Sequence, residues 1–197
     1  SRRQRQMCIR DSPSKRSCTN IFLNRDGKPM AHPQHKFAAI SRMIDGNVRR
    51  ESYLDESMSP MVTAHGYSSV VITNDEKNQG VLFQFLDKND QPLVSTQMGA
   101  AMQMNYDREG NKRTYLDRDG KPVSVNGVMH ELAEKNKWGE IESNSYLDHA
   151  GNMVVNQYGN AKLKYLYDRI GNFSGVVFYR ADCKPKSRLK IERDKHG

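Results

Sequence analysis

Closely spaced carboxylates are the first residues in this sequence whose types could support chemistry. Asp117 and Asp119, in the stretch D-R-D-G, have the spacing of the first two ligands of an EF-hand calcium loop. Val128 stands at the twelfth position of such a loop, where a bidentate glutamate is needed. Tight turns explain the same residues, because Asp and Gly are typical turn residues. We therefore expect turns here, with no metal site and no cofactor.

Histidines and cysteines are the other residue types that could bind a metal or catalyse a reaction. No C-x-x-C, H-E-x-x-H, G-x-S-x-G or phosphate-loop pattern occurs among them. We expect the scattered histidines to be solvated loop residues, and no enzymatic activity. They are His32, His35, His65, His130, His149 and His196.

The net charge of +8 comes from the two ends of the chain. Residues 1–19 contribute +5 and residues 183–197 contribute +4, which leaves residues 20–182 at −1. A nucleic-acid partner is therefore not expected for the body of the chain. No apolar run approaches the roughly 18 residues of a transmembrane helix, so no membrane span is expected.

The acidic turns recur because the chain repeats itself. The stretch Y-L-D-R-D-G-K-P-V begins at Tyr115, and near-copies begin at Phe22, Tyr53, Phe85, Tyr146 and, in degraded form, Phe178. Successive copies are 31, 32, 30, 31 and 32 residues apart, and a fixed period of this size indicates a repeat architecture. Carboxylates in repeat register favour a structural role over an acid–base pair.

Each unit also contains a strand pattern after the opening turn and its proline. In the fifth unit Ala161, Leu163, Tyr165 and Tyr167 alternate with mostly polar residues, as in a half-buried strand. Residues 129–135 of the fourth unit have lost this pattern and could be locally helical. A second turn then leads to the next aromatic residue, and the shorter spacing after Asp45 and Asp107 predicts shorter hairpins there.

Together these patterns predict an all-β fold: an elongated tandem array of antiparallel β-hairpins, with repeats of about 31 residues, in an open-ended meander or solenoid-like sheet. The array should cover residues 20–182, in two-turn units that start near 22, 53, 85, 115 and 146. Residues 1–19 are predicted to be a disordered lead-in. Residues 183–197 are predicted to be the basic, truncated start of a further repeat.

The recurring aromatic residues are the candidate binding surface. We expect them to pack between successive hairpins; the alternative is an exposed row that stacks on sugar rings or receives an extended partner strand. They are Phe22, Tyr53, Phe85, Tyr106, Tyr115, Tyr146, Tyr165, Tyr167 and Phe178. The expected turn residues are Asp26, Gly27, Asp107, Gly110, Asp119, Gly120, Asp168 and Gly171.

The pattern Tyr-Asp-x-x-Gly-Asn, at Tyr106–Asn111 and Tyr167–Asn172, resembles the YD repeats of Rhs-type bacterial proteins. This resemblance implies an extended antiparallel sheet and a cell-surface, secreted or shell-forming role. The long two-turn period with its proline departs from that family. Residues 146–151 are more loosely similar to choline-binding cell-wall repeats, although the single tryptophan, Trp138, argues against a cation–π choline site. Residues 1–12 resemble a translated sequencing adapter, which implies that they are not native.

The sequence thus predicts a non-catalytic structural or binding region of a larger bacterial surface or secreted protein. Its expected partners are neighbouring repeats or domains of the same longer chain. Two alternatives stay open: a glycan- or cell-wall-binding module, and an inert spacer attached to a missing catalytic or toxin domain.

Overall fold

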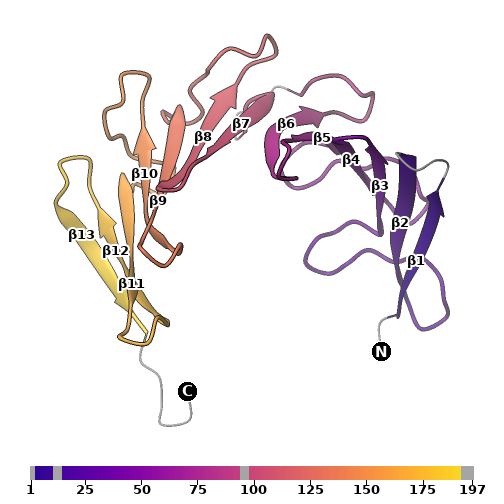
Figure 1. The fold of residues 1–197 in the computed structure, drawn as a ribbon. Helices are drawn as coiled ribbons and strands as arrows, with labels where there is room; N and C mark the ends of the chain where they lie inside the picture. The colour runs from indigo at the N-terminus through magenta and orange to yellow at the C-terminus, as the bar shows by residue number, and fades with distance from the viewer. Residues whose placement is uncertain (1–2, 11–14, 94–97, 192–197) are drawn as a thin grey trace. The chain divides into compact units, whose positions relative to one another are not determined.

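The computed structural model describes residues 3–10, 15–93 and 98–191, and their regular structure consists entirely of β-strands (Figure 1). Each strand pairs with its neighbour in the sequence, in an open antiparallel meander. The predicted all-β hairpin array is therefore confirmed. The strands are β1 (Arg3–Arg10), β2 (Lys15–Leu23), β3 (Ala39–Asp45), β4 (Val48–Leu54), β5 (Ser69–Asn74), β6 (Gly80–Leu86), β7 (Ala101–Tyr106), β8 (Gly110–Leu116), β9 (His130–Lys135), β10 (Ile141–Leu147), β11 (Lys162–Tyr167), β12 (Phe173–Tyr179) and β13 (Pro185–Lys190).

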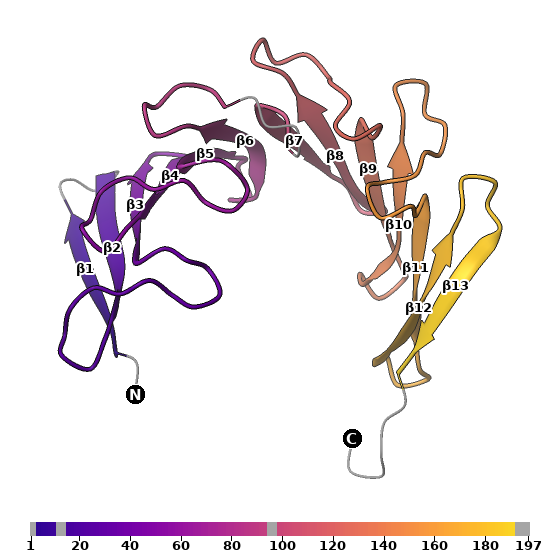
Figure 2. The ribbon, with the colours of Figure 1, turned by 180° about the vertical axis from the view of Figure 1, so that it is seen from behind.

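The chain divides into two compact units. The first comprises residues 1–103 and 116–121, and the second residues 104–115 and 122–197. Seen from behind, β2 to β6 follow one another in the first unit, and β9 to β13 do so in the second (Figure 2).

The core of the first unit forms where β-branched and aromatic residues alternate along β5 and β6. Val70, Ile72 and Phe85 are buried, and Tyr67 and Met102 are among the residues that pack against them. β-Branched and aromatic side chains suit a pleated, half-buried surface, which explains why the segment S-V-V-I-T-N forms a strand.

The sheet of the second unit has two chemically different faces. Residues directly opposite each other on paired strands point to the same face. Leu163 on β11 and Phe178 on β12 are such a pair on one face. Lys164, Val177 and Arg188 form a row across β11, β12 and β13 on the other face. We call the latter the polar face.

Within the described residues, the repeats that start at Phe22, Tyr53, Tyr115 and Tyr146 each contain three turns, whereas two were expected from the sequence. The additional turn lies between the proline and the next strand. In the second repeat, which starts at Tyr53, Leu54 makes an isolated bridge with Pro60. The backbone N–H of Thr63 then bonds to the carbonyl oxygen of Tyr67 at 2.8 Å and closes the additional turn. The proline was expected to start a strand, but it makes a single bridge because it has no N–H to donate to a ladder.

The last repeat departs from this plan. After the turn at Arg180–Cys183, the chain continues as β13, which pairs with β12 along its length. This strand lies within residues 183–197, which were expected to be the truncated start of a further repeat. Residues 192–197 lie outside the described chain.

Residues 1–19 were predicted to be disordered, and for most of them that prediction was wrong. β1 occupies residues 3–10 and β2 begins at Lys15. The physical reason is the edge of β3, whose backbone groups pair with β2 from Lys15 to Ile21. Residues 1–2 and 11–14 lie outside the described chain. The origin of residues 1–12 stays a prediction.

The fourth repeat, which starts at Tyr115, is not helical at residues 130–135, although its degraded alternation allowed a helix there. Residues 130–135 form β9, because β8 and β10 pair with it on both sides. Tertiary pairing therefore overrides the local preference. The shorter hairpins are confirmed: Asp45 pairs directly with Val48, and Asp107 N–H bonds to Gly110 O at 2.9 Å.

Candidate functional site

The carboxylates of the opening turns hold the backbone of those turns. The Oδ1 atom of Asp117 accepts hydrogen bonds from the N–H groups of Asp119 and Lys121, both at 2.9 Å. Such Asx turns form because a short side chain can bond to its own backbone two residues on. The same pair of bonds recurs at Asn24, Asp55, Asp87 and Asp148.

Asp26 and Asp119 lie in the opening turns, as predicted, although the side chains that accept hydrogen bonds from the N–H groups of these turns are those of Asn24 and Asp117. Asp26 and Asp119 are exposed and follow the bonding residue by two positions. They do not have positive φ angles, whereas Gly27 and Gly120 both have φ of 77°. Of these four residues, the glycines alone supply the left-handed conformation.

The hairpin turns repeat this chemistry. Asp168 Oδ1 accepts from the N–H groups of Ile170 at 3.0 Å and Asn172 at 2.9 Å, and Gly171 has φ of 89°. Asp107 Oδ1 accepts from Glu109 at 2.8 Å and Gly110 at 2.6 Å. Gly110 lacks the positive φ of a turn glycine; a Cβ there would collide with the carbonyl oxygen of Ala133.

No cluster of metal-binding side chains forms within the described residues: no three His, Cys, Asp or Glu side chains meet. The Asx turns explain why, since each recurring carboxylate is directed at backbone N–H groups of its own turn.

The recurring aromatics of the first unit form a continuous ladder. Phe22, Phe37, Tyr53, Tyr67 and Phe85 follow one another with ring-centroid distances of 6.0, 5.1, 5.8 and 5.0 Å. Tilted and edge-to-face rings at such distances stabilise a fold beyond their buried area. Burial, with the nearby Tyr67 and Glu51, raises the pKa of Tyr53.

Phe37 and Tyr67 were missed by the sequence analysis. Each immediately precedes a pair of small residues, Ala38–Ala39 and Ser68–Ser69, at the end of the additional turn. Aligning residues 37–39 (F-A-A) with residues 67–69 (Y-S-S) could have identified them. Histidines join the ladder as well: His32 lies 4.9 Å from Phe22, and His65 stacks 6.2 Å from Tyr67. The expectation of solvated loop histidines was wrong for the half-buried His32, whereas His65 is an exposed turn residue, as expected.

The tyrosines of the second unit make hydrogen bonds within the sheet. Tyr165 Oη accepts from Asn144 Nδ2 at 2.8 Å, and Tyr167 Oη donates to Ile141 O at 2.7 Å. All nine predicted aromatics are buried or half-buried. The most exposed aromatic rings are instead those of Trp138 and Tyr158, which are 71% and 74% exposed among the described residues.

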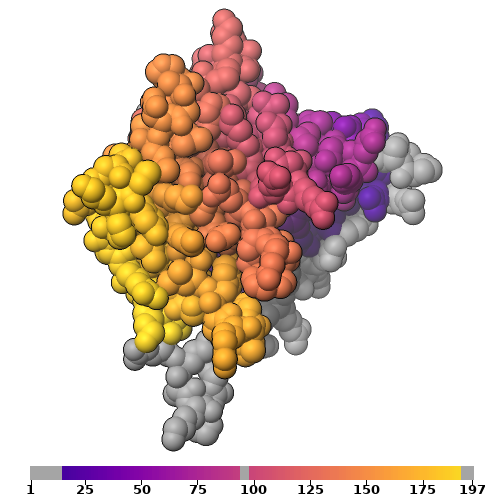
Figure 3. All heavy atoms as spheres, turned by 60° about the vertical axis from the view of Figure 1, so that its left-hand side comes forward, coloured from indigo at the N-terminus to yellow at the C-terminus, as the bar shows by residue number. Residues whose placement is uncertain are grey.

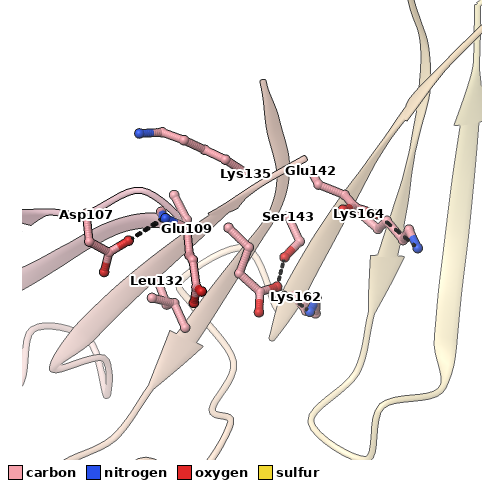
Figure 4. A pocket seen from close by; sticks show the side chains of 11 residues that line it. Asp107, Glu109, Leu132, Lys135, Glu142, Ser143, Lys162 and Lys164 are labelled. Atoms are coloured by element: carbon pink, nitrogen blue, oxygen red, sulfur yellow. Dashed lines mark hydrogen bonds and ion pairs between the residues drawn. The ribbon is translucent and has the colours of Figure 1, made fainter. Parts of the chain in front are cut away.

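A groove of about 510 Å³ lies on the polar face of the second unit (Figure 4). Its lining comes from the β7–β8 turn and from β9, β10 and β11, and it includes Asp107, Glu109, Gly110, Leu132, Ala133, Glu134, Lys135, Glu142, Ser143, Lys162 and Lys164. None of the nine aromatic candidates lines it. Asp107 and Gly110 are the two predicted turn residues that the structure brings to it.

Glu134 is the centre of a hydrogen-bond network in this groove. Its Oε2 accepts from the hydroxyl of the buried Ser143, and from Lys162 Nζ at 3.0 Å. These two bonds, led by that of Ser143, hold the pKa of Glu134 below its usual range. Beside them Glu142 faces Lys164 at 3.6 Å, while Lys135 extends away from the network (Figure 4).

This arrangement is suited to binding. A carboxylate that already accepts from a hydroxyl and an ammonium group is a weak base, so it is poorly placed to activate Ser143 as a nucleophile. Oxygen acceptors beside ammonium donors can instead bond to the hydroxyl and charged groups of a polar ligand. Recognising this site from the sequence would have required the pairing of β9 with β10, which the sequence does not reveal.

No protein-family model matches the chain, and no curated protein shows significant sequence similarity to it. Among the described residues, no helix has the length and apolar character needed to cross a membrane.

Proposed function

We propose that this chain is a non-catalytic scaffold of β-hairpin repeats within a larger bacterial surface or secreted protein. The observation that carries the proposal is the use of the recurring side chains within the fold. Asp117 and its counterparts bond to their own turns, and the ring of Tyr53 packs between those of Phe37 and Tyr67. The residues that recur in the repeats therefore stabilise the fold of the repeats.

Mutual support between units is the physical basis of such a scaffold. An isolated two-stranded hairpin is marginally stable in water. Here Tyr53 N–H bonds to Ser68 O at 3.0 Å, and Ala38 N–H bonds to Leu54 O at 2.8 Å, so each hairpin is joined to the next. A scaffold of this kind should tolerate a change in the number of units.

Deletion of one unit in register tests this property. Removing residues 54–85 joins Tyr53 to Leu86, which restores the aromatic–Leu–Asp stretch and removes β5 and β6 together. We expect a folded protein with strand-type circular dichroism and cooperative unfolding, because β4 can then pair with β7 in the same direction as it pairs with β5.

The matched control removes residues 54–78 and therefore takes away β5 but keeps β6. The strand that follows β4 then runs in the wrong direction for antiparallel pairing, and we expect misfolding. If both deletions abolish folding, the units are not interchangeable and the scaffold proposal fails.

A glycan-binding module is the second candidate, and the groove on the polar face favours it. Glu109 and Lys164 line the groove with a carboxylate and an ammonium group. We expect retention of the chain on a glycan array or on peptidoglycan, and a weaker signal for Glu109→Ala. Glu76→Ala, in the exposed β5–β6 turn, is the matched control. Absence of binding by the folded wild-type chain would count against this candidate and leave the scaffold proposal intact.

A further inference from the structure

All the charged side chains of β11, β12 and β13 are basic, and strand register places four of them, Lys162, Lys164, Arg188 and Lys190, on one face. These strands contain five Lys or Arg residues and no Asp or Glu: Lys162, Lys164, Lys186, Arg188 and Lys190. Lys164 lies opposite Val177, which lies opposite Arg188. Leu166, Gly175 and Lys190 form the neighbouring row on the same face. We call Lys162, Lys164, Lys186, Arg188 and Lys190 together the basic strip.

The spacing within the basic strip follows from strand geometry. Paired strands lie about 4.8 Å apart, and alternate residues along a strand are about 6.7 Å apart. The backbones of Lys164 and Arg188 are therefore separated by roughly 10 Å. Between them the floor consists of Val177 and Gly175, neither of which carries a polar side chain. The basic side chains therefore flank a surface of small apolar residues.

Two residues of the basic strip pair with carboxylates of the groove. Lys162 pairs with Glu134 at 3.0 Å and Lys164 faces Glu142 at 3.6 Å. Lys186 donates to the carbonyl oxygen of Gly159 at 3.1 Å, which leaves its charge uncompensated by that bond. All residues of β13, Arg188 included, are exposed, and β13 lies along the edge of the unit in the space-filling view (Figure 3).

We propose that the basic strip binds an acidic polysaccharide, a linear sugar chain bearing carboxylate or sulfate groups. Rows of Lys and Arg attract such polyanions through their summed field. The acidic groups would pair with Arg188 on β13, and the sugar hydroxyls would reach Glu109 and Glu134 in the adjoining groove. The proposal deepens the glycan-binding candidate and rests on it.

The groove adjoining the basic strip favours a sugar chain over a nucleic acid. It contributes Glu109, Glu134 and Glu142, whose oxygens accept hydrogen bonds from the many hydroxyl groups of a sugar chain. Proteins that bind single-stranded nucleic acids stack bases on rows of aromatic rings. On β11, β12 and β13 the polar face carries one ring, that of Tyr179, whereas Tyr165 and Phe178 lie on the opposite face.

Binding of the full chain to three probes of similar length tests the proposal: polygalacturonate, neutral dextran and single-stranded DNA. We expect polygalacturonate to bind best, and dextran to bind at least tenfold more weakly. Replacing Lys164 and Arg188 together with Gln should weaken polygalacturonate binding by about tenfold and reduce its salt dependence. Thermal unfolding of each variant verifies that it is folded.

Lys137→Gln with Arg169→Gln is the matched control, because both residues are exposed in hairpin turns of the same unit and their replacement removes the same charge. This pair should leave binding within twofold of the wild type. Equal weakening by both pairs, tighter binding of single-stranded DNA, or equal binding of dextran would overturn the proposal. A folded chain that binds none of the probes would overturn it and the glycan-binding candidate, while the unit-deletion result for the scaffold would stand.

Discussion

The hydroxyl group of Tyr115 on β8 donates a hydrogen bond to Oε1 of Glu131 on β9, and Arg113 binds the other oxygen of the same carboxylate at 2.9 Å. Both residues belong to the fourth repeat: Tyr115 opens it, and Glu131 lies in its strand with the degraded alternation. Burial and the bond to Glu131 raise the pKa of Tyr115 to about 12. We therefore expect the pairing of β8 with β9 to be sensitive to alkali.

Alkaline titration should reveal this link. A tyrosine whose folded pKa exceeds its unfolded value of about 10 stabilises the fold fully below pH 10, and this contribution is lost as the pH rises towards 12. The shift of about two units corresponds to roughly 3 kcal/mol at most. We expect the free energy of unfolding to fall across this window in urea titrations.

Tyr115→Phe is the variant for this measurement. It keeps the ring and removes the hydroxyl, so we expect a loss of about 1.5 kcal/mol at neutral pH and a shallower decline above pH 10. The pKa values of Tyr53, Tyr67 and Tyr146 are also raised by burial, so part of the decline should persist. An unchanged alkaline profile in the variant would mean that Tyr115 is not coupled to folding.

The Asx turns predict a difference between two substitutions at Asp87. Its Oδ1 accepts from the N–H groups of Asn89 at 2.7 Å and Gln91 at 2.9 Å. Asp87→Asn keeps this oxygen and should change the free energy of unfolding by less than about 0.5 kcal/mol. Asp87→Ala removes it and should cost about 1–2 kcal/mol. Equal effects in chemical denaturation would contradict a turn-forming role.

Met58 occupies the position of the opening turn at which other units have Gly27 and Gly120. Its φ is 63°, in the left-handed region that disfavours side chains. We expect Met58→Gly to stabilise the protein by up to about 1 kcal/mol. Gly120→Ala should destabilise it by a similar amount, because its Cβ would meet no atom within 4 Å and the cost is conformational. Thermal midpoints of the two variants should move in opposite directions.

Gly110 should be more sensitive to substitution than Gly120. The Cβ of an alanine there would collide with the carbonyl oxygen of Ala133 on β9, and backbone on a paired strand cannot move aside easily. We expect Gly110→Ala to cost several kcal/mol, well above the cost of Gly120→Ala. Similar costs at the two sites, measured by urea denaturation, would show that β8 and β9 can separate there.

The repeat period was sufficient to predict the open antiparallel meander, because turn residues and alternating strands recurred in the same order. The additional turn at residues 63–67 was missed, since its residues vary from unit to unit and only its closing backbone bonds are shared. Strand β9 was ambiguous, because its pairing with two neighbours outweighs its own sequence.

The groove could not be predicted from the sequence, because it too depends on strand pairing. Glu134, Ser143 and Lys162 meet only because Ser143 is paired with Glu134 on one side, and Lys162 follows on the next strand. A shift of one residue in the register of any one of these strands would send its side chain to the opposite face. Composition, by contrast, located the excess basic charge near the C-terminus without showing that it shares a face with this groove.

The dependence of stability on the number of hairpins tests the scaffold most directly. Three chains are compared: residues 15–60 (β2 to β4) and residues 15–92 (β2 to β6), which both end after complete opening turns, and the whole sequence. Urea unfolding should give free energies and denaturant slopes that rise with each addition, because every hairpin buries the face of its neighbour. Equal thermal midpoints and equal free energies for the two shorter chains would contradict a fold built from mutually stabilising repeats.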